Sequence, residues 1–270
     1  MFDLHVHSAP CVIPRLADDM TTARWFEDAG LAGCVLKGHC EPTAGRALSA
    51  GAGLRAEIVG ALVLNAAAGG INPDAVAAEL ALGARVVWMP TLDSRTHRLA
   101  GLPRPGQVTV TLAIPPLDPS CEAATRAVLE LVAEADAVIA TGHISTDEAV
   151  WLVRAARMAG VRRVLLTHPS YSVPSMDVRI ASELADAGAL VEVTAYQLRR
   201  QYGGHAAELA EFVRGVGARR CVLSSDAGQP DAPPAPEALA ELIDELAACG
   251  IDRGALEAAA GETPYELVCR

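Results

Sequence analysis

Short apolar runs alternate with alanine-rich segments along the whole chain. Each run has the length of a strand buried in a parallel sheet, and most are followed by a segment with the pattern of an amphipathic helix. We therefore expect eight strands, at residues 2–7, 33–39, 57–65, 84–90, 137–143, 163–168, 190–195 and 221–226.

The expected helices lie between these strands, and several of them end in glycine, a common residue at helix ends. They cover residues 21–30, 73–83, 122–135, 145–160, 175–188 and 205–217. Eight units of a strand followed by a helix favour an α/β fold closed as a parallel (β/α)8 barrel of the TIM type over an open sheet. We expect residues 1–270 to form one domain, because no linker-like change of composition divides them.

Two stretches depart from this alternation. Residues 95–118 are predicted to be an insertion, in which GLPRPGQ forms a turn-rich loop and QVTVTLAI adds an extra hairpin strand. The stretch AGQPDAPPAPEA, at 227–238, is predicted to be a loop after the last strand.

The composition narrows the class of protein. A chain that is 51% hydrophobic and 20% charged can form a large core, and a net charge of -11 without any basic run argues against binding to nucleic acid. Apolar stretches stay below the roughly 18 residues of a membrane span, and the start MFDLHVHS does not resemble a signal peptide. We expect a cytoplasmic protein that does not bind membranes. Its seven cysteines, an odd number without a CxxC motif, predict free thiols.

Candidate chemistry begins in the first predicted strand, FDLHVH. Side chains alternate between the two faces of a strand, so Asp3, His5 and His7 are expected on one face and the three apolar residues on the other. Two imidazoles at positions i and i+2 can converge on one metal ion.

Three other predicted strands end in a residue that can bind a metal: His143, His168 and Asp226. In a barrel, functional groups gather at the carboxyl ends of the strands. Imidazole and carboxylate are ligands of zinc, manganese and iron. We therefore predict a site for one or two divalent ions, with zinc as the first choice and manganese or iron as alternatives.

Lys37 is the only lysine among 22 basic residues. It lies two positions before His39 in GCVLKGH, so both side chains are expected to point inward beside the metal ligands. A lysine can lose its proton or react with carbon dioxide, which an arginine does not do. We predict that Lys37 and His39 belong to the site.

The remaining polar groups are assigned less directly. His97 and His205 are expected at the surface, and Glu192 is expected either to orient a ligand histidine or to form a structural ion pair. Loops after the strands carry groups that could bind a carboxylate or phosphate: Arg15, Tyr171, Arg179, Tyr196, Gln197 and Arg199.

The ordered set of a first-strand HxH, two strand-ending histidines and the final SSD resembles the amidohydrolase superfamily over nearly the whole chain. The resemblance implies that His5, His7, His143, His168 and Asp226 bind one or two divalent metals. It also implies that Asp226 relays a proton from a metal-activated water.

The sequence departs from the superfamily pattern in one place. Two-metal members commonly bridge their ions with a carboxylated lysine or a glutamate from the fourth strand, and ARVVWMPT contains neither. Either the site holds one metal, or Lys37 binds the metals as a bridge from the second strand.

The first half also resembles PHP-type phosphoesterases, which begin like DLHVHS. Gly38 replaces the aspartate of their second strand, and SSDAG lacks the histidine that they place two residues after the final aspartate. This family is therefore the second choice.

The resemblance implies a metal-dependent hydrolase that cleaves an amide, lactone, ester or similar bond of a small-molecule substrate. The alternatives are a PHP-type phosphoesterase, a decarboxylase or isomerase on the same barrel, and a barrel that only binds a ligand. Assembly into a homo-oligomer stays open.

Overall fold

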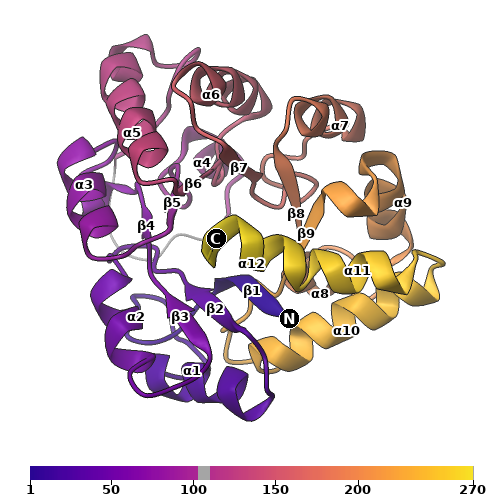
Figure 1. Ribbon diagram of the computed structural model, residues 1–270. Coiled ribbons are helices and arrows are strands. Elements are labelled where there is room, and N and C mark those ends of the chain that lie inside the picture. Colours follow the sequence, from indigo (N-terminus) through magenta and orange to yellow (C-terminus); the bar gives the residue numbers. More distant parts are fainter. Residues whose placement is uncertain (103–109, 270) are drawn as a thin grey trace.

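In the computed structural model, which describes residues 1–102 and 110–269, short parallel strands form the wall of a barrel and helices surround it (Figure 1). The strands are β1 (Phe2–Val6), β2 (Gly33–Leu36), β3 (Glu57–Val59), β4 (Ala61–Val63), β5 (Val86–Trp88), β6 (Val138–Ala140), β7 (Arg163–Leu166), β8 (Leu190–Thr194) and β9 (Cys221–Ser224).

The helices lie around the outside of the wall, except the last one, which lies across one end of it (Figure 1). They are α1 (Asp19–Asp28), α2 (Ala44–Ala50), α3 (Pro73–Ala81), α4 (Arg95–Leu99), α5 (Glu122–Glu134), α6 (Thr146–Met158), α7 (Val178–Asp186), α8 (Ala195–Arg200), α9 (Ala207–Val216), α10 (Ala235–Ala248), α11 (Arg253–Ala259) and α12 (Glu262–Cys269). The expected (β/α)8 barrel is confirmed.

The third predicted strand is in fact two strands. β3 pairs with β2 and β4 pairs with β5, and the chain breaks the ladder between them at Gly60. A β-carbon on Gly60 would lie 2.2 Å from the α-carbon of Ala44, so only glycine allows α2 to begin this close to the wall. The hydroxyl of Thr43 links β2 to β4. It accepts a hydrogen bond from the N–H of Ala61 at 2.8 Å and donates one to the carbonyl of Leu36 at 2.6 Å.

Two backbone hydrogen bonds close the barrel between β9 and β1. The N–H of Asp226 donates to the carbonyl of His5, and the N–H of His7 donates to the carbonyl of Ala227, each at 2.8 Å. Apolar side chains fill the interior below this point, among them Phe2 and Leu4.

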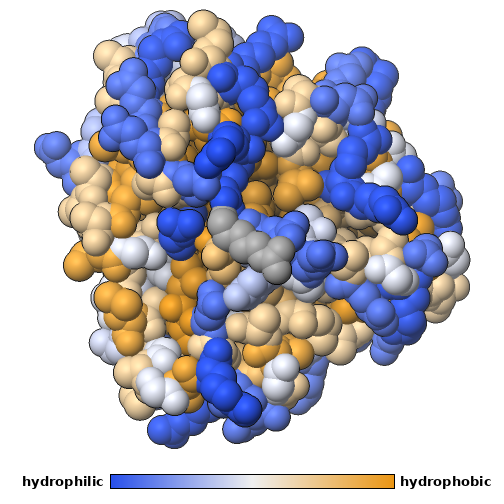
Figure 2. Space-filling model, in the orientation of Figure 1, coloured by the Kyte–Doolittle hydropathy of each residue, from blue (hydrophilic) through white to orange (hydrophobic). Residues whose placement is uncertain are grey.

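Helix α12 lies across the amino-terminal end of the barrel (Figure 1). Its residues Leu267 and Val268 pack into the interior apolar cluster, and Arg163 donates to the carbonyl of Leu267 at 2.6 Å. Figure 2 shows this end, where hydrophilic side chains spread over the outer helices and apolar ones lie between them. One end of the barrel is therefore plugged, and a site that opens to solvent has to lie at the other end.

All six predicted helices are present with shifted ends, and the insertion and the last loop differ from their predictions. The end of the predicted loop 227–238 is helical, because α10 already begins at Ala235. Residues 103–109, which hold most of the predicted turn-rich loop and the start of the predicted hairpin strand, lie outside the described residues. Among the described residues, 110–114 form no hairpin, and their one ladder contact is an isolated bridge between Leu112 and Ser94. None of the helices in the described part of the chain combines the length and apolar character that a membrane span needs.

Candidate metal centre

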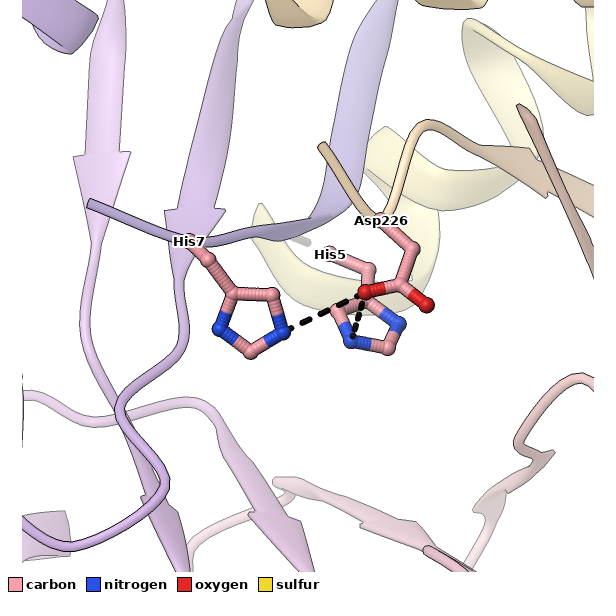
Figure 3. Close-up of side chains that lie close together, drawn as sticks. All are labelled: His5, His7 and Asp226. Atoms are coloured by element: carbon pink, nitrogen blue, oxygen red, sulfur yellow. Dashed lines mark ion pairs between the residues drawn. The ribbon is translucent and has the colours of Figure 1, made fainter. Parts of the chain in front are cut away.

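His5, His7 and Asp226 bring three ligand atoms together at the carboxyl end of the barrel (Figure 3). Oδ1 of Asp226 lies 3.1 Å from Nε2 of His5 and 3.2 Å from Nε2 of His7. The three atoms lie within 4.8 Å of one another, and all three residues are buried.

The other ring nitrogen of each histidine already has a partner. Nδ1 of His5 lies 3.1 Å from Oε1 of Glu192, and Nδ1 of His7 lies 2.8 Å from the carbonyl oxygen of Lys37. Both partners are acceptors, so each neutral ring carries its proton on Nδ1 and presents a lone pair at Nε2.

Two imidazole lone pairs and a carboxylate oxygen therefore face one point, which is a donor set that fits a divalent cation. Both imidazoles stay neutral at ordinary pH, because burial lowers the pKa of His5 to about 3 and that of His7 well below its ordinary value. Burial also raises the pKa of Asp226, against the opposing effect of the charges on His5 and Lys37. We assign the role of Glu192 accordingly: it contacts a candidate ligand histidine, the first of the two predicted alternatives.

A β-bulge in β1 orients these histidines, and because of it the side chains of this strand do not alternate as predicted. Asp3 pairs with Cys34 and Val6 with Leu36, so β1 holds one residue more than β2 between the two pairs. Phe2 and Leu4 consequently point into the interior, whereas Val6 packs in the outer core. The prediction that the three apolar residues share one face was wrong, because the extra residue changes the face that follows it.

Asp3 was predicted to share the face of the histidines, and it instead holds the bulge in place. Its carboxylate accepts hydrogen bonds from the N–H of His5 at 3.0 Å and from the N–H of Ser225 at 3.1 Å. It therefore joins β1 to β9 directly beneath the candidate ligands. Burial raises the pKa of Asp3 to about 7.

His168 and Asp226 adopt left-handed backbone conformations, with φ of 26° and 50°. Such angles are uncommon outside glycine and are found at functional sites. At His168 the turn redirects a side chain that simple alternation would place with Leu166, in the outer core. It lines the cavity instead.

Lys37 and His39 line the same cavity as the three candidate ligands. Nζ of Lys37 lies 2.8 Å from Nε2 of His5 and 4.9 Å from the centroid of the Trp88 ring. Burial lowers the pKa of this lysine to about 8. The ring of His39 stacks on that of His7 at 4.6 Å, and its Nδ1 lies 3.1 Å from the hydroxyl of Thr91.

His143 and His168 reach the same cavity but stand apart from the group of three ligand atoms. Their rings are 5.1 Å from each other, and the ring of His168 is 6.0 Å from that of His5. Nδ1 of His168 is buried without a hydrogen-bond partner among the described residues. These two histidines could therefore serve a second ion or a substrate.

His97 was predicted to lie at the surface, and this prediction was wrong. It is buried on α4, and its Nδ1 lies 3.0 Å from Nδ1 of His143. Its local sequence carries no apolar pattern that signals burial, so the only clue was Ser94, which caps α4 by accepting from the N–H of His97. His205 is exposed, as expected.

A cavity of about 230 Å³ opens above these groups. Of the predicted loop residues, Arg15, Tyr171 and Tyr196 line it. Arg179 is exposed and pairs with Glu183. The other two predicted loop residues have structural partners: Gln197 caps its own helix, and Arg199 pairs with Glu241.

The sequence matches the model of a family of unknown function, DUF6282, over residues 1–192. The chain belongs to DUF6282. No curated protein matches the sequence of this DUF6282 member.

Solved structures resemble this DUF6282 member over almost its full length. An organophosphorus hydrolase from Deinococcus radiodurans has a TM-score of 0.63 at 15% identity, covering 98% of this chain and 92% of the other. The lactonase Lmo2620 from Listeria monocytogenes has a TM-score of 0.68 at 13% identity, covering 99% and 94%. YJJV, a TatD homolog from Escherichia coli K12, has a TM-score of 0.61 at 14% identity, covering 99% and 97%. At these identities the likeness supports the barrel fold.

Proposed function

We propose that this DUF6282 member is a metal-dependent hydrolase of the amidohydrolase type. The observation that carries the proposal is the convergence of Nε2 of His5, Nε2 of His7 and Oδ1 of Asp226, with both distal ring nitrogens held by acceptors. The names of the similar structures, a lactonase and an organophosphorus hydrolase, agree with this reading.

In this proposal His5, His7 and Asp226 hold a divalent cation, with zinc the first choice for two imidazoles and a carboxylate. When bound, the cation lowers the pKa of water toward neutrality and polarises the bond to be cleaved. Asp226 then accepts the proton of the attacking water. Glu192 keeps the ring of His5 oriented, and Lys37 places its Nζ 2.8 Å from Nε2 of the same ring.

His143, His168 and His39 face the same cavity and complete the proposed site. His143 and His168 are proposed to hold a second ion, and His39 to contact the substrate. Lys37 stays a candidate for a bridge between two ions or for a cation that polarises the substrate. The substrate is a small molecule, because the cavity holds about 230 Å³.

The backbone disfavours the alternative of a PHP-type phosphoesterase. A β-carbon at Gly38 would lie 2.6 Å from the carbonyl oxygen of Glu41, and one at Gly228 would lie 2.0 Å from that of His7. The two side chains that the phosphoesterase pattern requires have no room at these positions.

Metal content tests the proposal directly. We expect the purified protein to hold at least one equivalent of a divalent metal by elemental analysis, and His5→Ala with His7→Ala to lose it. His205→Ala is the matched control, because His205 is an exposed histidine. A double variant that keeps a stoichiometric metal would contradict the proposed ligands.

Reaction products in ¹⁸O-labelled water test the second part of the proposal. Hydrolysis of a lactone, ester or amide adds one water across the cleaved bond and leaves the label in the new carboxylate, whereas decarboxylation releases carbon dioxide and isomerisation leaves the composition of the substrate unchanged. Screening these three bond types with the metal-loaded protein therefore separates hydrolysis from the rival chemistries.

A further inference from the structure

Arg15 lies in the loop between β1 and α1 and lines the same cavity as the candidate ligands. Its Nε and Nη2 are buried and have no hydrogen-bond partner among the described residues. Guanidinium groups nearly always bond their buried N–H groups, because an unpaired one is costly. Two such atoms on one side chain indicate that a bound ligand accepts hydrogen bonds from them.

The two unpartnered nitrogens belong to the same edge of the guanidinium. Nε–H and one N–H of Nη2 point in parallel from that edge, and they match the two oxygens of a carboxylate. Arg46 shows the arrangement within this protein: its Nε and Nη2 bind the two oxygens of Asp19 at 2.8 Å and 2.7 Å. The equivalent edge of Arg15 has no protein carboxylate.

The charge of the cavity lining favours an anion. Arg15 and Lys37 supply two positive groups and Asp226 is the one acid among the lining residues, in a chain whose net charge is -11. Asp226 is also committed to the candidate metal ligands.

The loop holds Arg15 in place without a ligand. The N–H of Ala9 donates to the carbonyl of Ala17, and the N–H of Leu16 donates to the carbonyl of Gly228, each at 2.8 Å. The first bond closes the loop on itself, and the second ties it to the segment that follows Asp226. The backbone on both sides of Arg15 is therefore already ordered, so binding of an anion costs little further backbone freedom.

The rest of the lining near Arg15 suits an apolar or aromatic body. Ile13, Leu92, Tyr171 and Tyr196 contribute to the cavity wall. The rings of the two tyrosines lie 5.8 Å apart in an edge-to-face arrangement. A planar ring can pack against such a surface.

We propose that Arg15 binds the carboxylate of the substrate side-on, and that the substrate is a small carboxylic acid with an apolar or aromatic body. The proposal rests on the proposed function in one respect: the bond that is cleaved is placed at the end of the cavity where His5, His7 and Asp226 lie.

Binding of benzoate and benzamide tests the role of Arg15, because the two probes have the same shape and differ in charge. Calorimetric titration of the wild-type protein should give a Kd for benzoate at least about tenfold below that for benzamide. Arg15→Gln should raise the benzoate Kd at least about tenfold and leave benzamide unchanged. Arg15→Lys keeps the charge and loses the pair of parallel N–H donors, so its benzoate Kd should lie between those of the wild type and Arg15→Gln.

Arg179→Gln is the matched control, because it removes the same charge from an exposed arginine on α7. Equal benzoate binding in wild type and Arg15→Gln overturns the proposal, as does a benzoate preference that Arg179→Gln also abolishes. Tighter binding of phenyl phosphate than of benzoate overturns the carboxylate as the ligand.

The titrations are made on chelator-treated and metal-loaded protein, with metal content measured for each variant. Dependence on Arg15 in both forms supports the proposal even where the metal assignment fails. A benzoate preference that exists in the metal-loaded form alone, and that survives Arg15→Gln, assigns the carboxylate to the metal and overturns the role of Arg15.

Discussion

Lys37 is nearly fully buried, and its Nζ sits between Nε2 of His5 and the face of Trp88. The ammonium and a bound cation would compete for the same lone pair of His5. This site therefore favours a lysine that can yield its proton, and burial that lowers its pKa to about 8 makes that loss easier.

We predict that Lys37→Arg lowers turnover by at least about a hundredfold, the scale of a lost proton-transfer or electrostatic contribution. The longer guanidinium cannot place its charge at 2.8 Å from His5 in a space packed against Trp88. Elemental analysis separates the two roles: loss of metal with activity indicates a bridging lysine, and loss of activity alone indicates an ammonium. Normal metal and normal turnover would return Lys37 to a structural role.

At the residue scale, the sequence predicted the candidate ligands better than it predicted their surroundings. His5, His7 and Asp226 each end or alternate along a strand, and that local pattern survives folding. His97 lies on the short helix α4 and Arg15 in a loop, and neither segment has such periodicity, so the burial of both side chains depends on how distant segments pack. Only the folded chain brings His97 to His143.

The bulge of β1 is the element on which the centre depends. It lets Leu4 pack inward and still turns His5 toward Asp226, and it frees the N–H of His5 from the ladder. Asp3 accepts hydrogen bonds from this N–H and from that of Ser225, the residue directly after the neighbouring strand β9.

We predict that Asp3→Ala lowers the free energy of unfolding by about 2–5 kcal/mol, because two buried N–H groups lose their acceptor. Urea unfolding followed by circular dichroism measures the change. Asp244→Ala, which removes an exposed carboxylate on α10, should change stability by less than about 1 kcal/mol. Comparable losses in the two variants would mean that Asp3 does not stabilise the junction.

Strand boundaries show where the pattern of a single element stops being informative. EIVGALVLN is one apolar run in sequence, and it divides at Gly60 because α2 packs against that point. Likewise, Asp3 to Val6 alternate regularly in sequence, and a single extra residue relative to β2 reverses the face. Both departures arise from pairing with other segments, which a run of residues does not encode alone.

At the scale of the whole molecule, the barrel could be predicted from the repeated order of strands and helices, because that order can be recognised in the sequence without knowledge of tertiary contacts. Its closure placed six buried histidines at one end, and burial lowers the pKa of five of them. The residues are His5, His7, His39, His143 and His168. Three buried acids have raised pKa values and act in the opposite direction: Asp3, Glu192 and Asp226.

These shifts predict that the chelator-treated protein loses stability as the pH falls from about 6 toward 5. In this window most histidines of the unfolded chain are protonated, because their ordinary pKa lies near 6.5, while the folded chain keeps these five neutral. Their protons then outnumber those that the three acids of the folded chain can hold, so the unfolded state binds more protons and is favoured by acid. Each excess proton changes the free energy of unfolding by about 1.4 kcal/mol per pH unit.

His168→Asn isolates the contribution of one of these histidines. Asparagine tolerates the left-handed backbone at this position and does not titrate. The substitution therefore removes the imidazole whose pKa burial lowers to about 3. Urea unfolding at pH 6.5 and at pH 5 should show a decline in stability that is smaller in the variant by about 1.4 kcal/mol per pH unit. His205→Ala, which removes an exposed histidine, should keep the wild-type slope. If His168→Asn also keeps that slope, His168 takes up its proton at the same pH in the folded and unfolded protein, and burial does not keep its imidazole neutral.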